Sequence, residues 1–244
     1  MRRQIILAST AVAACWSSPA LAPVVPPVAR ALGLPRRHSD TGTVAVTFDD
    51  GPHPEGTPAV LEALREAGAE ATFFLVGEQV ERYPALAAEI AAAGHGIALH
   101  GYRHRNALRL LPGTFESDLD RAAAAVAAAI GSAPVIHRPP YGIYSPAALG
   151  TVRSRGLWPL LWSRWGHDWR GSATAAGIAA EVTEDLRGGD VLLLHDADHY
   201  SAAGSWRATA EALPEVLRRI EEAGLAPAAL KGSRLRPRTP SATS

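Results

Sequence analysis

The sequence predicts an α/β fold whose parallel strands form a barrel. Short apolar runs alternate with helical segments along most of the chain, and reactive side chains follow several of these runs directly. The clearest case is the run 44–48, which ends in Asp49 and Asp50 and breaks at Gly51-Pro52. In a parallel barrel the carboxyl ends of the strands share one face, where the connecting loops form a pocket. We therefore expect a functional site at that face.

Capping residues mark the helices that separate the strands. Thr57-Pro58 is typical of an N-cap followed by proline in the first helical position, and Ser145-Pro146 repeats the pattern. Glycines such as Gly68, Gly131 and Gly224 mark helix ends. The expected order is strand 44–48, helix 57–68, strand 71–76, helix 84–93, strand 96–99, helix 115–130, strand 135–137, helix 145–156, strand 157–162, helix 174–187, strand 190–194, helix 207–223 and a last short strand within 225–230.

Composition limits the class of protein. The chain has 244 residues, is 47% hydrophobic and carries a formal net charge of zero, which suits one large domain. Because it lacks an excess of positive charge, nucleic acid is not an expected partner. The lone cysteine, Cys15, excludes an intrachain disulfide.

The first 22 residues have the pattern of an export signal or membrane anchor. Arg2-Arg3 precede an apolar stretch at 5–15 and a small-residue site at 20–22. Three outcomes stay open: cleavage, which Pro23 disfavours, lipidation at Cys15, or an uncleaved membrane anchor. We expect an exported or cell-envelope protein, which the N-terminal segment could attach to the membrane.

The rest of the chain divides into three predicted parts. Residues 23–40 have the composition of a linker, with adjacent prolines and arginines. Residues 41–230 carry the alternating strands and helices of the predicted domain, and residues 231–244 form a predicted disordered basic tail.

The adjacent acids Asp49 and Asp50 have two interpretations. At the end of a buried strand they would be held rigidly in a pocket, where carboxylates often take part in chemistry. Alternatively, they belong to a solvated turn that is stabilised by hydrogen bonds to its own backbone. The pair alone does not decide between these interpretations.

Two histidines favour the functional interpretation. His100 and His104 follow the apolar run 96–99 and are four residues apart, so a helical turn would put both rings on one face. Two histidines and a carboxylate are a common Zn²⁺ ligand set that leaves one coordination position open. One of Asp49 and Asp50 would then bind the metal and the other would remain free.

Two further strand ends carry reactive residues. The run 135–137 leads into Arg138, whose guanidinium can hold a carboxylate, and into Tyr141. A surface arginine beside a loop is the plainer alternative. The run 190–194 leads to His195, whose ordinary pKa suits a general acid, although a histidine that hydrogen-bonds the strand end would look the same.

These residues resemble the motifs of a known family. The segments TFDDG at 47–51, H-x-x-x-H at 100–104, RPPYG at 138–142, Asp168-Trp169 and Leu193-Leu194-His195 are similar, in order and spacing, to the five motifs of the polysaccharide deacetylases, also called the NodB-homology or carbohydrate esterase family 4 group. The resemblance covers roughly residues 41–230 and implies a distorted (β/α)7 barrel as a single domain.

The resemblance also implies a role for each motif residue. Asp50, His100 and His104 would bind the metal, and Asp49 would be the general base. Arg138 would hold Asp49 in place, His195 would be the general acid, and Asp168 would orient His195. The backbone amide of Tyr141 would bind the oxyanion, and Trp169 and Leu193 would line the acetyl pocket.

The implied activity is the metal-dependent removal of N-acetyl groups from an N-acetylglucosamine polymer or oligomer. The expected cofactor is Zn²⁺ or another divalent metal such as Co²⁺ or Mn²⁺, and the expected partner is an N-acetylated glycan. Alternatives are an O-acetyl (xylan-type) esterase with the same site and a carbohydrate-binding protein that has lost catalysis, although a pure binder would not need these motif residues. A phosphohydrolase of the aspartyl-phosphate type would require D-x-D in place of adjacent acids.

The chain departs from the family pattern at two positions. Gly101 stands where many members have Ser or Thr, and Trp165 stands where many have an acid. His167 neighbours Asp168, so only the resemblance favours His195 over it as proton donor. The segment 195–199, with two histidines and two aspartates, is a rival candidate metal site, for which turn and rim contacts are the preferred interpretation.

Overall fold

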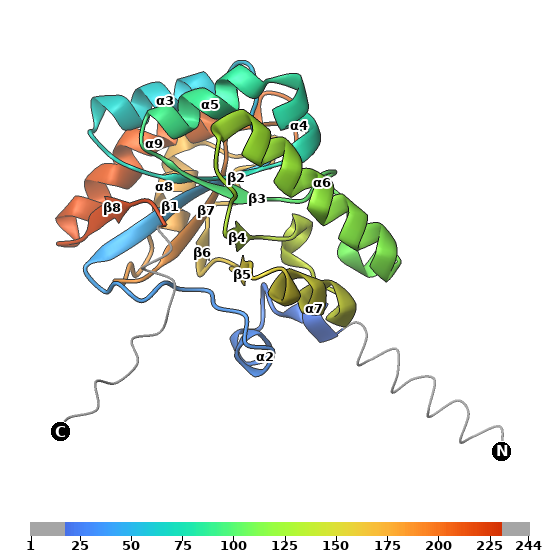
Figure 1. Ribbon diagram of the computed structural model, residues 1–244. Coiled ribbons are helices and arrows are strands. Elements are labelled where there is room, and N and C mark those ends of the chain that lie inside the picture. The colour runs from blue at the N-terminus through green and yellow to red at the C-terminus, as the bar shows by residue number, and fades with distance from the viewer. Residues whose placement is uncertain (1–17, 231–244) are drawn as a thin grey trace, which may run out of the picture.

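The computed structural model describes residues 18–230, which form one curled parallel sheet surrounded by helices (Figure 1). The strands are β1 (Thr43–Asp49), β2 (Thr72–Leu75), β3 (Gly96–Leu99), β4 (Ile136–His137), β5 (Trp158–Pro159), β6 (Arg164–Trp165), β7 (Val191–His195) and β8 (Ala226–Ala228). The helices are η1 (Ser18–Leu21), α2 (Pro26–Ala31), α3 (Gly56–Glu66), α4 (Gly77–Arg82), α5 (Pro84–Ala92), η2 (Ala107–Arg109), α6 (Pro112–Ile130), η3 (Pro140–Gly142), α7 (Pro146–Ser154), α8 (Ala175–Val182) and α9 (Ser205–Glu222).

The sheet has the strand order β5-β4-β3-β2-β1-β7-β6, and β8 pairs with the first residues of β1. Every named strand pair is parallel. Because the strands run parallel, their carboxyl ends lie together at one face; helices connect most of them, although β5 and β6 are joined without one. The predicted α/β fold with a distorted (β/α)7 barrel is confirmed.

The register brings distant residues to one face of the barrel. Asp49, the last residue of β1, is paired with Phe74 of β2 on one side and with His195 of β7 on the other. Leu99 of β3 is paired with His137 of β4, so the residues that follow both strands also emerge at this face. The site is therefore assembled from strand ends that are far apart in sequence.

The residues between β5 and β6 link the two ends of the sheet. Leu160 donates a backbone hydrogen bond to the carbonyl of His137 (3.0 Å), and Ser163 donates one to Val191 (3.0 Å). The single predicted strand 157–162 is thus two short strands with a crossing segment between them. This crossing is why the barrel is distorted.

The prediction that residues 23–40 form a linker is wrong, because this segment packs onto the barrel. Ala29 and Leu34 belong to the hydrophobic core. Pro35 accepts a backbone hydrogen bond from Leu161 (2.9 Å), and Arg37 forms an antiparallel bridge and a 2.8 Å ion pair with Asp190. The segment covers the crossing between β5 and β6, whose outer backbone groups would otherwise lack protein partners.

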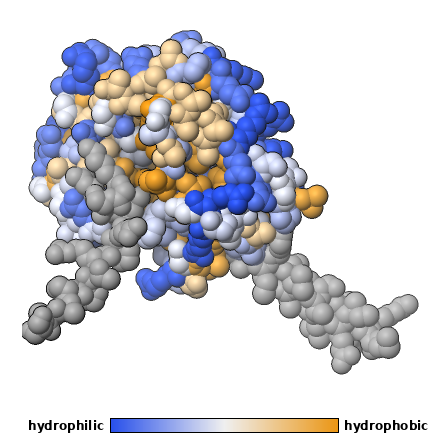
Figure 2. Space-filling model, viewed as in Figure 1, coloured by the Kyte–Doolittle hydropathy of each residue, from blue (hydrophilic) through white to orange (hydrophobic). Residues whose placement is uncertain are grey.

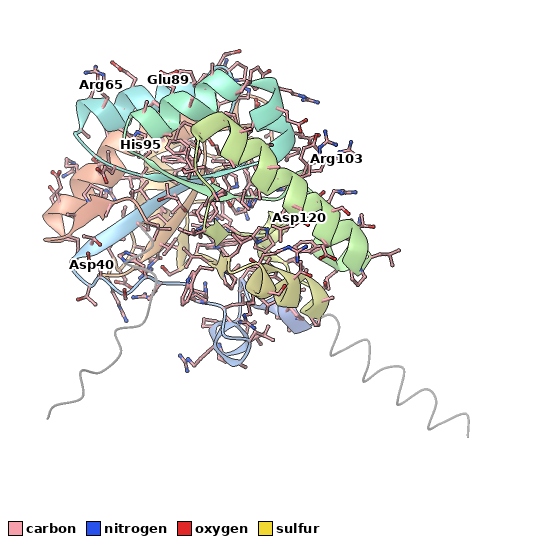
Figure 3. The ribbon with its side chains drawn as sticks, in the orientation of Figure 1. Asp40, Arg65, Glu89, His95, Arg103 and Asp120 are labelled. Atoms are coloured by element: carbon pink, nitrogen blue, oxygen red, sulfur yellow. The ribbon has the colours of Figure 1, made fainter. Side chains whose placement is uncertain are left out.

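Apolar side chains fill the space between the sheet and its helices. In β7 all four residues before His195 are buried, as expected for a strand covered on both faces. The face of the molecule seen in Figure 2 has an apolar area near its middle, with hydrophilic residues around it. Charged residues such as Arg65, Glu89 and Asp120 lie on the outer surface of the helices (Figure 3).

Two local features differ from the expected elements. Helix α4 (Gly77–Arg82) was not predicted, because six residues are too few to show a helical period. Helix α3 begins at Gly56, so Thr57 is not its N-cap; the Thr57 hydroxyl instead donates to Asp196 and accepts from the backbone N–H of His53.

Several predictions about the chain ends lie outside the described residues. These include the apolar stretch 5–15, Cys15 and the tail 231–244. Of the predicted signal, only Ser18–Leu21 and the buried Ala22 are described. Within residues 18–230, no helix is both long enough and apolar enough to span a bilayer.

Candidate active site

The carboxylate of Asp50 lies between two histidine rings at the barrel's carboxyl face. Its Oδ1 is 3.4 Å from Nε2 of His100 and 3.3 Å from Nε2 of His104. Asp50 follows β1 with a positive φ of 80°, and His100 follows β3. The turns after β1 and β3, which lie on either side of β2, therefore aim all three side chains at one point. The helical turn expected at residues 100–104 is wrong: these residues form a bend, in which Gly101 has a positive φ.

This arrangement fits a divalent cation. Nδ1 of His100 lies 2.9 Å from the carbonyl of Arg138, so it carries the proton and leaves a lone pair on Nε2. That lone pair faces Oδ1 of Asp50, which is buried and has no hydrogen-bond partner among the described residues. Opposed acceptors without a shared proton are stabilised when a cation lies between them, and two imidazoles with one carboxylate suit Zn²⁺.

Burial shifts the pKa values of all three groups toward their neutral forms. Burial raises the pKa of Asp50 to about 7 and lowers that of His104 to about 4. It also lowers the pKa of His100, where the neighbouring His104 adds to the effect. Unprotonated imidazoles are the form that binds metal, and a bound cation would favour the ionised form of Asp50.

Asp49, next to Asp50, has different partners. Its Oδ1 accepts a hydrogen bond from Nη1 of Arg138 (2.6 Å), and its Oδ2 is 3.7 Å from Nε2 of His100. Burial raises the pKa of Asp49, although the charge of Arg138 opposes that shift. One oxygen is thus held by arginine while the other faces the group of metal-binding candidates.

Arg138 is fully buried and held on several sides. Nη1 also donates to the hydroxyl of Thr47 (2.9 Å), and Nη2 donates to the carbonyl of Leu161 (3.1 Å). Its guanidinium lies 3.8 Å from the ring centre of Phe74. The surface-arginine alternative is therefore wrong, and the side chain fixes the position of Asp49.

His195 and Asp168 form a second pair on the other side of Asp49. Nδ1 of His195 lies 2.9 Å from Oδ1 of Asp168, whose Oδ2 accepts from the backbone N–H of His195 (2.6 Å) and from the hydroxyl of Thr209 (2.8 Å). Burial lowers the pKa of His195, but the charge and hydrogen bond of Asp168 outweigh it and raise the value to about 10. His195 is therefore a cation near neutral pH.

The remaining predicted residues surround these groups. Tyr141 has a left-handed φ of 61° and is 55% exposed. Its ring contacts that of His104 edge-on, with ring centres 4.6 Å apart. Trp169 contacts His195 edge-on, with ring centres 5.5 Å apart. Leu193 is buried within β7, two residues before His195.

His167 does not compete with His195 for Asp168. Its Nδ1 lies 2.7 Å from Oε2 of Glu181, on α8, and its ring packs between those of Trp165 and Trp169. The geometry therefore pairs Asp168 with His195 and places His167 against Glu181.

The two departures from the motif pattern have different outcomes. Gly101 has φ 80°, which disfavours any side chain, and an added Cβ would lie 3.3 Å from the carbonyl oxygen of Arg103. Arg103 itself points outward beside α4 and α6 (Figure 3). Trp165 packs against Trp162, with ring centres 5.7 Å apart, and we find no further structural reason for a tryptophan there.

The structure does not bring the predicted rival segment 195–199 together as one metal site, because His195 pairs with Asp168 and Asp196 accepts from Thr57. Asp198 and His199 instead bring potential ligand atoms close to His53. However, Nδ1 of His53 accepts from the backbone N–H of Gly56 (2.9 Å), so its proton is on Nε2, which points at Asp198 (3.1 Å). A donor N–H cannot be a metal ligand. Asp198 also accepts from the backbone N–H of Gly204, before α9 (2.6 Å).

Several residues of the site were not assigned a role from the sequence. Thr209 supports Asp168 from α9, and no sequence signal indicates it. Tyr200 stacks on His104 with ring centres 4.4 Å apart and an interplanar angle of 10°. Its position shortly after His195 was the only available signal.

Comparison with known proteins agrees with this geometry. The family model described as polysaccharide deacetylase matches residues 36–159, which is half of the chain. The chain belongs to the polysaccharide deacetylase family. It is 35% identical to a chitooligosaccharide deacetylase of Azorhizobium caulinodans over 67% of this chain and 78% of that protein. The predicted enzyme class, a polysaccharide deacetylase, is confirmed.

Further relatives of this polysaccharide deacetylase point the same way. A peptidoglycan-N-acetylglucosamine deacetylase of Bacillus cereus is 35% identical over 71% of this chain and 81% of that protein. The crystal structure of the Bc1960 peptidoglycan N-acetylglucosamine deacetylase has a TM-score of 0.75 at 28% identity, and covers 82% of this chain and 90% of that one. These relatives are named for deacetylation of N-acetylglucosamine-containing glycans.

Proposed function

We propose that this polysaccharide deacetylase removes N-acetyl groups from an N-acetylglucosamine polymer or oligomer and depends on a divalent metal. The observation that carries the proposal is the convergence of Asp50, His100 and His104 at one point. Two further pairs accompany this group: Asp49 held by Arg138, and His195 held by Asp168. The names of the relatives support the glycan class.

Asp50, His100 and His104 would hold the ion, with Zn²⁺ the first candidate and Co²⁺ or Mn²⁺ as alternatives. Two imidazole nitrogens and one carboxylate oxygen leave room for water or substrate. When bound, the ion would supply Lewis-acid polarisation of the acetyl carbonyl and a lower pKa for water beside it.

Asp49 acts as the general base in this proposal. Arg138 holds Oδ1, which leaves Oδ2 to accept a proton from the attacking water. The raised pKa of Asp49 brings its basicity closer to neutral pH, where a base is most effective. Because the guanidinium of Arg138 stays protonated, it orients Asp49 and takes no part in the proton transfer.

His195 acts as the general acid. Asp168 occupies Nδ1, so the proton on Nε2 is the one that can pass to the departing amine nitrogen. The pKa of about 10 keeps that proton on the ring at neutral pH until the amine leaves. This division of work resembles that of other sites in which two groups of shifted pKa serve as base and acid.

The acetyl group would lie between the two pairs. The backbone amide at Tyr141 would donate to the developing oxyanion, which is the usual role of a fixed N–H group in acyl transfer. Trp169 and Leu193 would line the methyl pocket, because their apolar surfaces lie beside His195.

Acetate release from three substrates tests the proposed function. Purified protein loaded with Zn²⁺ is incubated with peptidoglycan, chitin oligomers and acetylated xylan, and acetate is measured. We expect release from an N-acetyl substrate, and loss of both bound zinc and activity in His104→Ala. Release from xylan alone would replace the N-deacetylase with the O-acetyl esterase. Full zinc retention in His104→Ala would overturn the ligand assignment.

We also propose that the protein works at the cell envelope, where its proposed glycan substrates are found. The export-like pattern of residues 1–22 supports this location. Cell fractionation with an antibody against the full chain tests it, and recovery only in the cytosolic fraction would contradict it.

A further inference from the structure

Tyr200, in the loop between β7 and α9, is a residue to which neither the motifs nor the proposed chemistry gives a role. We propose that Tyr200 is a positioning residue that holds the ring of His104 in its metal-binding orientation. The proposal rests on the proposed metal site, and it concerns a contact outside the motif residues.

The two histidines differ in how their second ring nitrogen is held. Nδ1 of His100 donates to the carbonyl of Arg138 at 2.9 Å, the usual arrangement for a metal-binding histidine. Nδ1 of His104 is buried, and no other residue of the described chain hydrogen-bonds it. No hydrogen bond from another residue therefore orients the ring of His104; apart from an interaction with its own backbone, its orientation depends on packing.

That packing comes mainly from Tyr200. The two rings are nearly parallel, at 10°, with centres 4.4 Å apart. Tyr141 contacts the same imidazole at 66°, with ring centres 4.6 Å apart. Tyr200 thus limits tilting of the His104 plane, while Tyr141, more exposed, closes a second side.

The Tyr200 ring is itself anchored through its hydroxyl. The hydroxyl donates to Oε1 of Glu78 (2.9 Å) and accepts from Nε2 of Gln79 (3.0 Å), both in the first turn of α4. Gln79 is buried, so this contact is not a loose surface pair. A ring fixed at one end by two hydrogen bonds can resist displacement better than a ring that only packs.

The same turn of α4 also holds the loop that carries His104. Gly77 donates its backbone N–H to the carbonyl of Gly101 (2.9 Å), and Glu78 donates to that of Tyr102 (2.9 Å). The start of α4 therefore fixes both the backbone around His104 and the ring that stacks on it. This shared attachment sets the distance between Tyr200 and His104.

Zinc affinity of the full-length protein tests the proposal. Metal-stripped wild type, Tyr200→Leu and Tyr200→Phe are titrated with Zn²⁺ against a chromogenic chelator. Tyr83→Leu is the control, because Tyr83 is at the opposite end of α4 from Glu78. We expect Tyr200→Leu to weaken zinc binding by about 10–100-fold, as for other supporting residues of metal ligands, and Tyr200→Phe by less than about tenfold.

Kinetics separate positioning from other roles. At saturating zinc, Tyr200→Leu should recover most of its kcat with KM unchanged. A raised KM with wild-type zinc affinity would assign Tyr200 to substrate binding and overturn the proposal, as would equal zinc affinity in all variants. If Tyr200→Leu does not fold, Tyr200→Phe decides alone: losing the hydroxyl bonds to Glu78 and Gln79 should still weaken zinc binding by at least about twofold, and wild-type affinity would overturn the proposal. A wild type without zinc affinity would instead overturn the proposed metal site.

Discussion

Asp49 and Asp50 are neighbours in sequence but have opposite surroundings. Asp49 is paired with Arg138 at 2.6 Å, whereas Oδ1 of Asp50 lies 3.4 Å from His100 Nε2 and 3.3 Å from His104 Nε2. The reason is the backbone. Asp49 ends an extended strand, whereas Asp50 has a left-handed φ, which turns its own side chain toward the two histidines.

This difference predicts opposite effects of two matched substitutions. Asp49→Asn should keep the metal and lower kcat by about 10²–10⁴-fold, the usual contribution of a positioned base. Asp50→Asn should lose metal and activity together, because a neutral amide is a weaker ligand. Metal content by elemental analysis, with turnover measured in parallel, checks both. Identical behaviour of the two variants would disprove the separate roles.

The His195–Asp168 pair predicts a pH effect on stability in the metal-free protein. Because the folded state raises the pKa of His195 from 6.5 to about 10, the pair's contribution is complete below about pH 6.5. It is lost as the pH rises toward 10. The difference in free energy of unfolding between wild type and Asp168→Asn should therefore shrink from pH 7 to pH 10 in denaturant titrations. A difference that stays constant over this range would contradict the ion pair.

At the scale of elements, the segment before β1 has more importance than its composition indicates. Leu34 is 3% exposed, and the segment crosses the junction of β5 and β6, where Arg37 pairs with Asp190. Prolines and arginines made it look like a linker, since composition does not show which neighbours a segment meets. The barrel depends on this segment to cover its junction.

Truncation of Leu34 measures that dependence. Leu34→Ala should lower the free energy of unfolding by about 2–5 kcal/mol, the cost of removing a buried leucine side chain. Val24→Ala, in the same segment but 58% exposed, should change it by less than about 0.5 kcal/mol. Denaturant unfolding of both variants tests this, and equal effects would show that the segment is only loosely attached.

At the scale of the whole molecule, the site exists because parallel strands end at one face. Asp49 and His195 are register partners on the neighbouring strands β1 and β7. These strands are distant in sequence: Thr47 of β1 donates a hydrogen bond to Leu192 of β7, which is 145 residues away. No single element contains a working set of groups. The proposed chemistry therefore depends on correct assembly of the entire sheet.

The sequence by itself determined the fold class, the family and the identity of the motif residues. Apolar runs that end in Asp, His or Arg are local patterns, and such patterns can be recognised from the sequence alone. Their spacing predicted that His100 and His104 belong with one of the two adjacent acids, and the family resemblance selected Asp50. In the structure, Nε2 of each histidine lies within 3.4 Å of Oδ1 of Asp50.

Only the tertiary structure decided which partner each group has. The attachment of His195, not His167, to Asp168, the burial of Arg138, and the packing of residues 23–40 all depend on contacts between segments far apart in the chain. The same is true of Tyr200 against His104. Such contacts are set by strand register and helix packing, so no local pattern of residues encodes them.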